Sequence, residues 1–156
     1  ALPYQQVRVS GLSLLELLIT IALISVVAGV AIPLYQGYVQ EARISTAVKD
    51  IRTISLILDG AYYDDALPDS LAEIGAERDD PWGNPYVYLR IAGNPLEGKG
   101  KVKVRKDKNL HPLNTDYDLY SMGPDGKSNI PLTAKASRDD IVRASNGGFV
   151  GEAVYY

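Results

Sequence analysis

Cysteine is absent from this chain of 156 residues, so its parts cannot be fastened to one another by a disulfide. Histidine occurs once, at His111 in a polar turn, which excludes a Ser-His-Asp set, a Cys-His set and a histidine-rich metal cluster. Charge is nearly balanced, with 16 Lys and Arg against 19 Asp and Glu, and this balance indicates no particular partner. The sequence therefore shows no catalytic machinery, and we expect the chain not to be an enzyme.

Charge is missing altogether between Leu17 and Tyr35, a run close to the roughly 20 residues that a helix needs to cross the hydrocarbon of a bilayer. Glu16 stands at the start of this run as a lone carboxylate. An ionisable group at mid-membrane is disfavoured by roughly 2.5–3.5 kcal/mol, and by less near the edge, so Glu16 indicates a partner charge on another chain. The alternative is that Glu16 reaches the lipid headgroups and only marks the end of the span.

An apolar stripe continues beyond this run at spacings of three and four residues, which is typical of an amphipathic helix. The pattern predicts one helix from about Leu12 to Tyr63, whose outer half packs on the sheet of a small head. Pro33 cannot donate to the carbonyl four residues earlier, and we expect a bend or a loosened turn there. The stripe consists of Val39, Ala42, Ile44, Ala47, Val48, Ile51, Ile54, Ile57 and Leu58.

The head is predicted to contain a short helix followed by an antiparallel meander. Asp69 is the expected N-cap of a helix over Ser70–Ile74, which Gly75 closes. Runs of strand-forming residues between turn signals predict three strands, at 86–91, 101–105 and 117–122. A long N-terminal helix packed on such a sheet is an α+β fold.

Basic residues gather after Gly98 and could grip nucleic-acid phosphates. Alternation instead places Lys101, Lys103 and Arg105 on one solvated strand face, so we expect no nucleic-acid partner. The segment from Gly93 to Lys99 mimics a phosphate-binding loop, but Gly100 occupies the Ser/Thr position and we expect a hairpin.

A long polar loop follows the third predicted strand and carries Asp125, Asp139 and Asp140. Connections of this length without secondary structure are uncommon in compact domains unless they are functional or disordered. Three aspartates brought together would repel unless a cation joined them, and calcium takes six to eight oxygen ligands in flexible geometry. The alternative is a merely solvated loop. The acidic spacing of an EF-hand is not present.

The segment Gly11-Leu-Ser-Leu-Leu-Glu16, with the apolar run and Pro33, resembles the processing site of type IV pilins and type II secretion pseudopilins. This resemblance implies that a membrane prepilin peptidase cuts between Gly11 and Leu12 and methylates the new amino terminus. It also implies that Glu16 pairs with the Leu12 amine of the neighbouring subunit. A cleavable secretory signal is the rival interpretation. The implied divisions are a leader (1–11), a transmembrane and assembly half of the helix (12–36) and a periplasmic globular domain (37–156).

Three blocks of the head, at 80–86, 120–126 and 137–141, look like the major, G-type pseudopilin of type II secretion. In that family a structural calcium is held by side chains at the positions matching Asp125, Asp139, Asp140 and Ser137, and by carbonyls at those matching Met122 and Lys127. The loop would then be a metal-binding loop that fastens a head without cysteine.

The resemblance implies a single-pass inner-membrane subunit that polymerises into a helical periplasmic filament and drives export of folded proteins. Its partners would be further copies of itself, minor pseudopilins, the inner-membrane assembly platform, the prepilin peptidase and membrane lipid. Two alternatives remain from the sequence. One is the major pilin of a surface type IV pilus for adhesion, twitching or DNA uptake, and the other is a monomeric membrane-anchored calcium-binding module or an enzyme of unseen mechanism.

Overall fold

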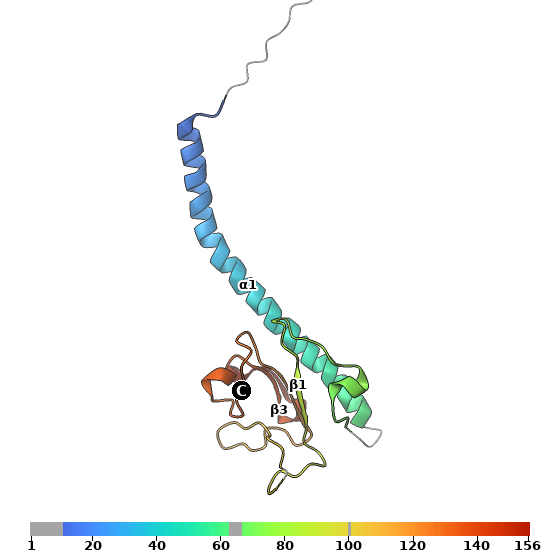
Figure 1. The fold of residues 1–156 in the computed structure, drawn as a ribbon. Coiled ribbons are helices and arrows are strands. Elements are labelled where there is room, and N and C mark those ends of the chain that lie inside the picture. The colour runs from blue at the N-terminus through green and yellow to red at the C-terminus, as the bar shows by residue number, and fades with distance from the viewer. Residues whose placement is uncertain (1–10, 63–66, 100) are drawn as a thin grey trace, which may run out of the picture. The chain divides into compact units, whose positions relative to one another are not determined.

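The computed structural model describes residues 11–62, 67–99 and 101–156, and the chain divides into two compact units between Gln40 and Glu41. Its longest element is the helix α1, and four short strands make up the sheet (Figure 1). The predicted α+β fold, with a long N-terminal helix on a small antiparallel sheet, is confirmed. The elements are α1 (Leu14–Tyr62), η1 (Leu71–Ile74), β1 (Val87–Arg90), β2 (Tyr117–Ser121), η2 (Lys135–Ser137), β3 (Ile141–Ala144), η3 (Ser145–Gly147), β4 (Phe149–Glu152) and η4 (Ala153–Tyr155).

The helix α1 matches the predicted helix closely. It begins at Leu14 because Ser13 caps it: the Ser13 hydroxyl accepts a hydrogen bond from the backbone N–H of Glu16 at 3.2 Å. The helix continues through Pro33 to Tyr62. A bend at Pro33 stays a prediction, and Tyr63 lies outside the described residues.

The sheet runs in the order β1-β2-β3-β4, and each pair of neighbours is antiparallel. Successive residues of a strand point to opposite faces, so the sheet separates two apolar clusters. On one face Tyr117 and Leu119 of β2 pack with the apolar stripe of α1. On the other face Val142 and Ala144 of β3 pack with the loops. The predicted stripe is confirmed at its centre, where the fully buried residues are Ala47, Ile51, Ile54 and Leu58.

The prediction of a strand over 101–105 is wrong, because the described residues form no strand between β1 and β2. The predicted hairpin, which needed this strand, is wrong as well. This segment is held by contacts other than a strand ladder, since the backbone N–H of Arg105 donates to the carboxylate of Asp118 at 2.7 Å. Arg105 is also only 3% exposed, so its expected place on a solvated face is wrong, whereas Lys101 and Lys103 are exposed as expected. The strands β3 and β4 were not predicted.

The short helix of the head is a 3-10 helix, and its N-cap is Ser70 where Asp69 was expected. The reason is Glu73, whose carboxylate accepts hydrogen bonds from the Asp69 backbone N–H at 3.1 Å and from the Ser70 hydroxyl at 3.3 Å. Gly75 closes the helix in the left-handed conformation with a φ of 63°, as predicted.

Candidate functional site

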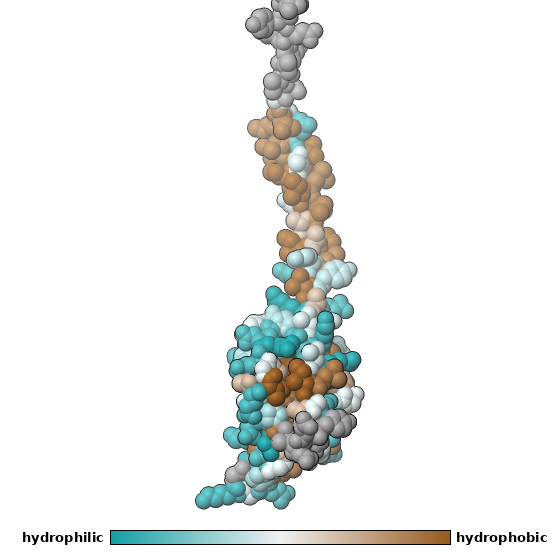
Figure 2. All heavy atoms as spheres, turned by 90° about the vertical axis from the view of Figure 1, so that its right-hand side faces the viewer, coloured by the Kyte–Doolittle hydropathy of each residue, from teal (hydrophilic) through white to brown (hydrophobic). Residues whose placement is uncertain are grey.

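The first candidate site is the N-terminal half of α1. Among the described residues, α1 is the one helix that is long and apolar enough to cross a membrane. Its most apolar stretch of 18 residues has a mean hydropathy of 2.7, and none of that stretch is buried. Figure 2 shows that apolar side chains cover this part of the helix. A surface of this kind is stable only against lipid or against other apolar helices.

Glu16 interrupts this surface at the first turn of the helix. Its backbone is satisfied by the Ser13 cap, and its carbonyl accepts a hydrogen bond from the Thr20 hydroxyl at 2.7 Å. Its side chain is exposed, and no described residue pairs with its carboxylate. The carboxylate is therefore available to a cation outside the described chain. The Ser13 cap was missed from the sequence, although Ser13-x-x-Glu16 is a capping-box pattern.

Gly11 and Leu12, the residues of the predicted processing site, lie in a short non-helical stretch before α1. Both residues are exposed. The rest of the predicted leader, residues 1–10, lies outside the described residues.

The second candidate site is the loop between β2 and β3, residues 122–140, which we call the aspartate loop. The structure brings Asp125 and Asp139 together, because the backbone N–H of Asp125 donates to the Asp139 carboxylate at 3.4 Å. Asp125 also accepts a hydrogen bond from the backbone N–H of Lys127 at 2.8 Å, which forms a tight turn. Gly123 has a φ of +64°, and the Asp139 carbonyl fills the space that a Cβ would need there, so only glycine suits this position.

The other predicted ligands point elsewhere. The Ser137 hydroxyl bonds to the backbone N–H and carbonyl of Asn129, both at 2.8 Å. One oxygen of Asp140, Oδ2, accepts from Arg105 Nη2 and from the Ser128 hydroxyl, both at 2.6 Å. Consequently, the described residues contain no group of three or more acidic, histidine or cysteine side chains arranged to hold a metal. Met122 directly follows β2, at the start of the loop.

The second carboxylate oxygen of Asp140, Oδ1, is unusual because buried polar atoms normally form hydrogen bonds. Asp140 is fully buried, yet Oδ1 has no hydrogen-bond partner among the described residues. Burial raises the pKa of the Asp140 carboxyl, and the bonds from Ser128 and Arg105 oppose this shift. Asp139 precedes Asp140 in the sequence, and a buried carboxylate oxygen that has no partner among the described residues is the kind of hard ligand that calcium prefers.

Two further residues anchor the start of the aspartate loop, and sequence reasoning gave them no role of their own. Asp80 accepts hydrogen bonds from the backbone N–H of Asn84 at 2.9 Å and from the hydroxyl of Ser121. The Asn84 side-chain amide then donates to the Gly123 carbonyl at 3.2 Å. The block at 80–86 thus holds the end of β2 against the first turn of the aspartate loop.

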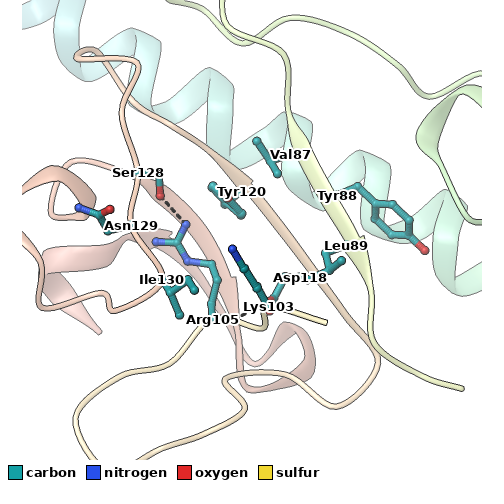
Figure 3. A pocket seen from close by; sticks show the side chains of 10 residues that line it. All are labelled: Val87, Tyr88, Leu89, Lys103, Arg105, Asp118, Tyr120, Ser128, Asn129 and Ile130. Atoms are coloured by element: carbon teal, nitrogen blue, oxygen red, sulfur yellow. Dashed lines mark hydrogen bonds between the residues drawn. The ribbon is translucent and has the colours of Figure 1, made fainter. Parts of the chain in front are cut away.

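A pocket of about 290 Å³ lies over β1 and β2, next to Arg105 and Ser128 (Figure 3). Arg105 lies along it, with its guanidinium 4.0 Å above the ring of Tyr120 and its Nη1 bonded to the Ser128 hydroxyl at 2.7 Å. The lining residues are Val87, Tyr88, Leu89, Lys103, Arg105, Asp118, Tyr120, Ser128, Asn129 and Ile130.

Comparison with known proteins gives three curated relatives. The chain is 26% identical over 146 residues to type II secretion system core protein G of Pseudomonas aeruginosa, covering 79% of this chain and 89% of that protein. It is 29% identical over 147 residues to the protein of the same name from Aeromonas hydrophila, covering 80% and 89%. It is 26% identical over 146 residues to type IV major fimbrial protein FimA of Dichelobacter nodosus, covering 92% and 86%.

No family model and no solved structure matches the chain. The relatives are structural pilin and pseudopilin subunits, which are not enzymes. They confirm the resemblance to a G-type pseudopilin within the pilin-like family, and with it the expectation that the chain is a structural subunit.

Proposed function

We propose that this pilin-like structural subunit is the major pseudopilin of a type II secretion system, and that copies of it polymerise into a helical periplasmic filament that drives export of folded proteins. The observation that carries the proposal is the first turn of α1, where the Glu16 carboxylate, without a partner among the described residues, stands on an exposed apolar helix. Two of the relatives are core proteins of type II secretion.

Assembly begins, in this proposal, with cleavage between Gly11 and Leu12 by a prepilin peptidase. The exposed, non-helical bond suits this step. Cleavage frees the amino group of Leu12, the peptidase then transfers a methyl group to it from a methyl donor, and this amine on one subunit pairs with Glu16 on its neighbour. The pair neutralises a carboxylate that would otherwise be costly among apolar helices, and it fixes the register of one subunit against the next. A contact of this head-to-tail kind does not close on itself and therefore gives a filament.

Before assembly, the same helix anchors the subunit in the inner membrane as a single span, with the head in the periplasm. Pro33 leaves one carbonyl of the span without its backbone donor, which loosens the helix where identical helices bundle. Minor pseudopilins, the inner-membrane assembly platform and membrane lipid are the further partners that this function requires.

We also propose that the aspartate loop binds calcium. Asp125 and Asp139 already lie together, and Oδ1 of Asp140 is buried with no partner in the described part of the chain. Met122 and Lys127 would offer carbonyls, and Ser137 would need to release Asn129 to become a ligand. The ion would neutralise the carboxylates and fasten a head that has no cysteine.

The assembly proposal is tested with Glu16→Gln, which keeps the size of the side chain and removes its charge. We expect the variant to insert into the membrane and to be cleaved, but to form few filaments and to support little export. Glu41→Gln removes another exposed carboxylate of α1 and is the matched control, with normal filaments expected. Normal filament yield from Glu16→Gln would count against the pairing.

A surface type IV pilus is the second candidate function, because the similarity to the fimbrial protein covers 92% of this chain. Deletion of the gene in its own host separates the two. Loss of protein export with unchanged surface pili supports the pseudopilus, whereas loss of surface pili with unchanged export supports the pilus.

A further inference from the structure

The side chain of Arg105 is a buried cation that joins three parts of the head. Its side chain is 4% exposed, and its Nη2 lies 2.6 Å from Oδ2 of Asp140 at the end of the aspartate loop. Its Nη1 donates to the hydroxyl of Ser128 in the middle of that loop at 2.7 Å. The guanidinium also stacks 4.0 Å over the ring of Tyr120 in β2, so loop and sheet meet at one group (Figure 3).

The backbone that carries Arg105 is itself fixed. Its N–H donates to Oδ2 of Asp118 at 2.7 Å, and its carbonyl accepts from the N–H of Leu113 at 2.9 Å. The other oxygen of Asp118 accepts from the side-chain amide of Asn114 at 2.9 Å. Arg105 therefore holds the loop from a rigid base on the sheet.

The carboxylate of Asp140 depends on this cation. It is fully buried, and a buried charge without a counter-charge is strongly destabilising. The Ser128 hydroxyl donates to the same oxygen as Arg105 does, at 2.6 Å, so the three side chains form a closed triangle. This triangle joins the middle of the aspartate loop to its end.

We propose that Arg105 is a built-in cation that closes the aspartate loop onto the sheet, so that closure of this loop does not require a bound metal. Arg105 binds the buried carboxylate of Asp140 and the hydroxyl of Ser128 at one point, as a bound metal ion could do. Calcium at Asp125 and Asp139 would add stability to a loop that is already closed. The proposal therefore stands whether or not the chain forms a filament and whether or not it binds calcium.

The test uses the full chain in dodecyl maltoside micelles with a calcium chelator. Loop closure is measured by hydrogen exchange at two amides of the aspartate loop, which are protected while their hydrogen bonds are formed. The N–H of Asn129 donates to the Ser137 hydroxyl, and the N–H of Leu132 donates to the Lys106 carbonyl. The amide of Ile51, in the core of the helix, measures global unfolding. We expect both loop amides of the unaltered chain to be as strongly protected in chelator as in calcium.

Arg105→Met should lower the Tm by about 10 °C or more. The faster exchange of the Ile51 amide in this variant measures the loss of global stability. Beyond that loss, we expect the two loop amides to exchange at least about tenfold faster than in the unaltered chain. Asp140→Asn combined with Arg105→Met removes both charges and should recover most of the lost Tm, which a merely structural role for Arg105 would not produce. Arg105→Lys keeps the charge and should restore part of the protection. Arg138→Met, an exposed cation of the same loop, is the matched control.

Two results would overturn the proposal. One is loop amides of the unaltered chain that lose their protection in chelator and regain it in calcium, because the metal would then close the loop. This measurement needs no variant and so decides the matter even if Arg105→Met does not fold. The other is a double variant no more stable than Arg105→Met, because the two charges would then not be coupled.

Discussion

Two leucines on one helix give the sharpest test of how the head is held together. Leu58 is fully buried between α1 and the sheet, whereas Leu56, two residues earlier, is 73% exposed. Leu58→Ala and Leu56→Ala remove the same atoms from the same helix, so helix propensity changes equally in both. Only the packing against the sheet differs.

The structure sets the size of the difference. Leu58 belongs to the cluster with Ile54, Tyr117 and Leu119, and truncation of such a residue costs about 2–5 kcal/mol through lost burial and the cavity left behind. We therefore expect Leu58→Ala to lower the Tm by about 8–20 °C. Leu56→Ala should change the stability by less than about 0.5 kcal/mol, because its side chain already lies in water.

The assay is thermal unfolding of the full chain in detergent, followed by the near-ultraviolet circular dichroism of the tyrosines, of which those at 86, 88, 117, 120, 155 and 156 follow the long helix in the head. Equal shifts for the two variants would refute the account, because the stripe of α1 would then not be what binds the helix to the sheet.

Three further predictions concern the loops and the sheet. Gly123→Ala should lower the free energy of unfolding by at least about 2 kcal/mol, because a Cβ at a φ of +64° is strained and meets the Asp139 carbonyl; thermal unfolding measures this. Burial raises the pKa of Tyr88 to about 12, above its ordinary 10.0, so its contribution to stability is complete below pH 10 and is lost as the pH rises to 12. Tyr88→Phe should therefore flatten the fall of the Tm across this window. Calcium at about a thousand times its dissociation constant should add roughly 4 kcal/mol to the stability of the unaltered chain, and this gain should be lost in Asp125→Ala.

Each of these variants has a matched control. Gly60→Ala lies in α1 with open space around its Cβ and should leave the stability unchanged or raise it by up to about 1 kcal/mol. Tyr155→Phe alters a tyrosine that is 76% exposed and should keep the alkaline fall unchanged. Asp79→Asn removes an exposed carboxylate outside the aspartate loop and should keep the calcium response. A control that behaves like its paired variant would contradict the reasoning for that pair.

The parts of the fold that the sequence predicted well are those governed by local periodicity. The stripe around Ile51 recurs at helical spacing, and the strands near Val87 and Tyr117 lie between clear turn signals, so neighbouring residues were enough to place them. The cap at Ser13 was missed, although its partner Glu16 is only three residues away and local pattern alone could have shown it.

The parts that sequence reasoning missed depend on distant side chains. Strand β3 is buried along its whole length and contains Arg143, whose charge is balanced by Asp116 at 2.6 Å. No local alternation marks such a strand, and among the described strands β4 pairs with β3 alone. Likewise, Arg105 reads as a surface residue until its partners Asp118 and Asp140 are placed beside it by the fold.

The assembly of copies through Glu16 is the central claim, and the structure of the filament tests it most directly. We would determine by electron cryomicroscopy the distance between the Glu16 carboxylate of one subunit and the nearest amino terminus of another. The account predicts that each subunit in the filament begins at Leu12. The amine of this Leu12 should lie within ion-pair distance, about 4 Å, of Glu16 on a neighbouring subunit. A filament in which Glu16 faces lipid or solvent, with the amine of Leu12 elsewhere, would contradict it.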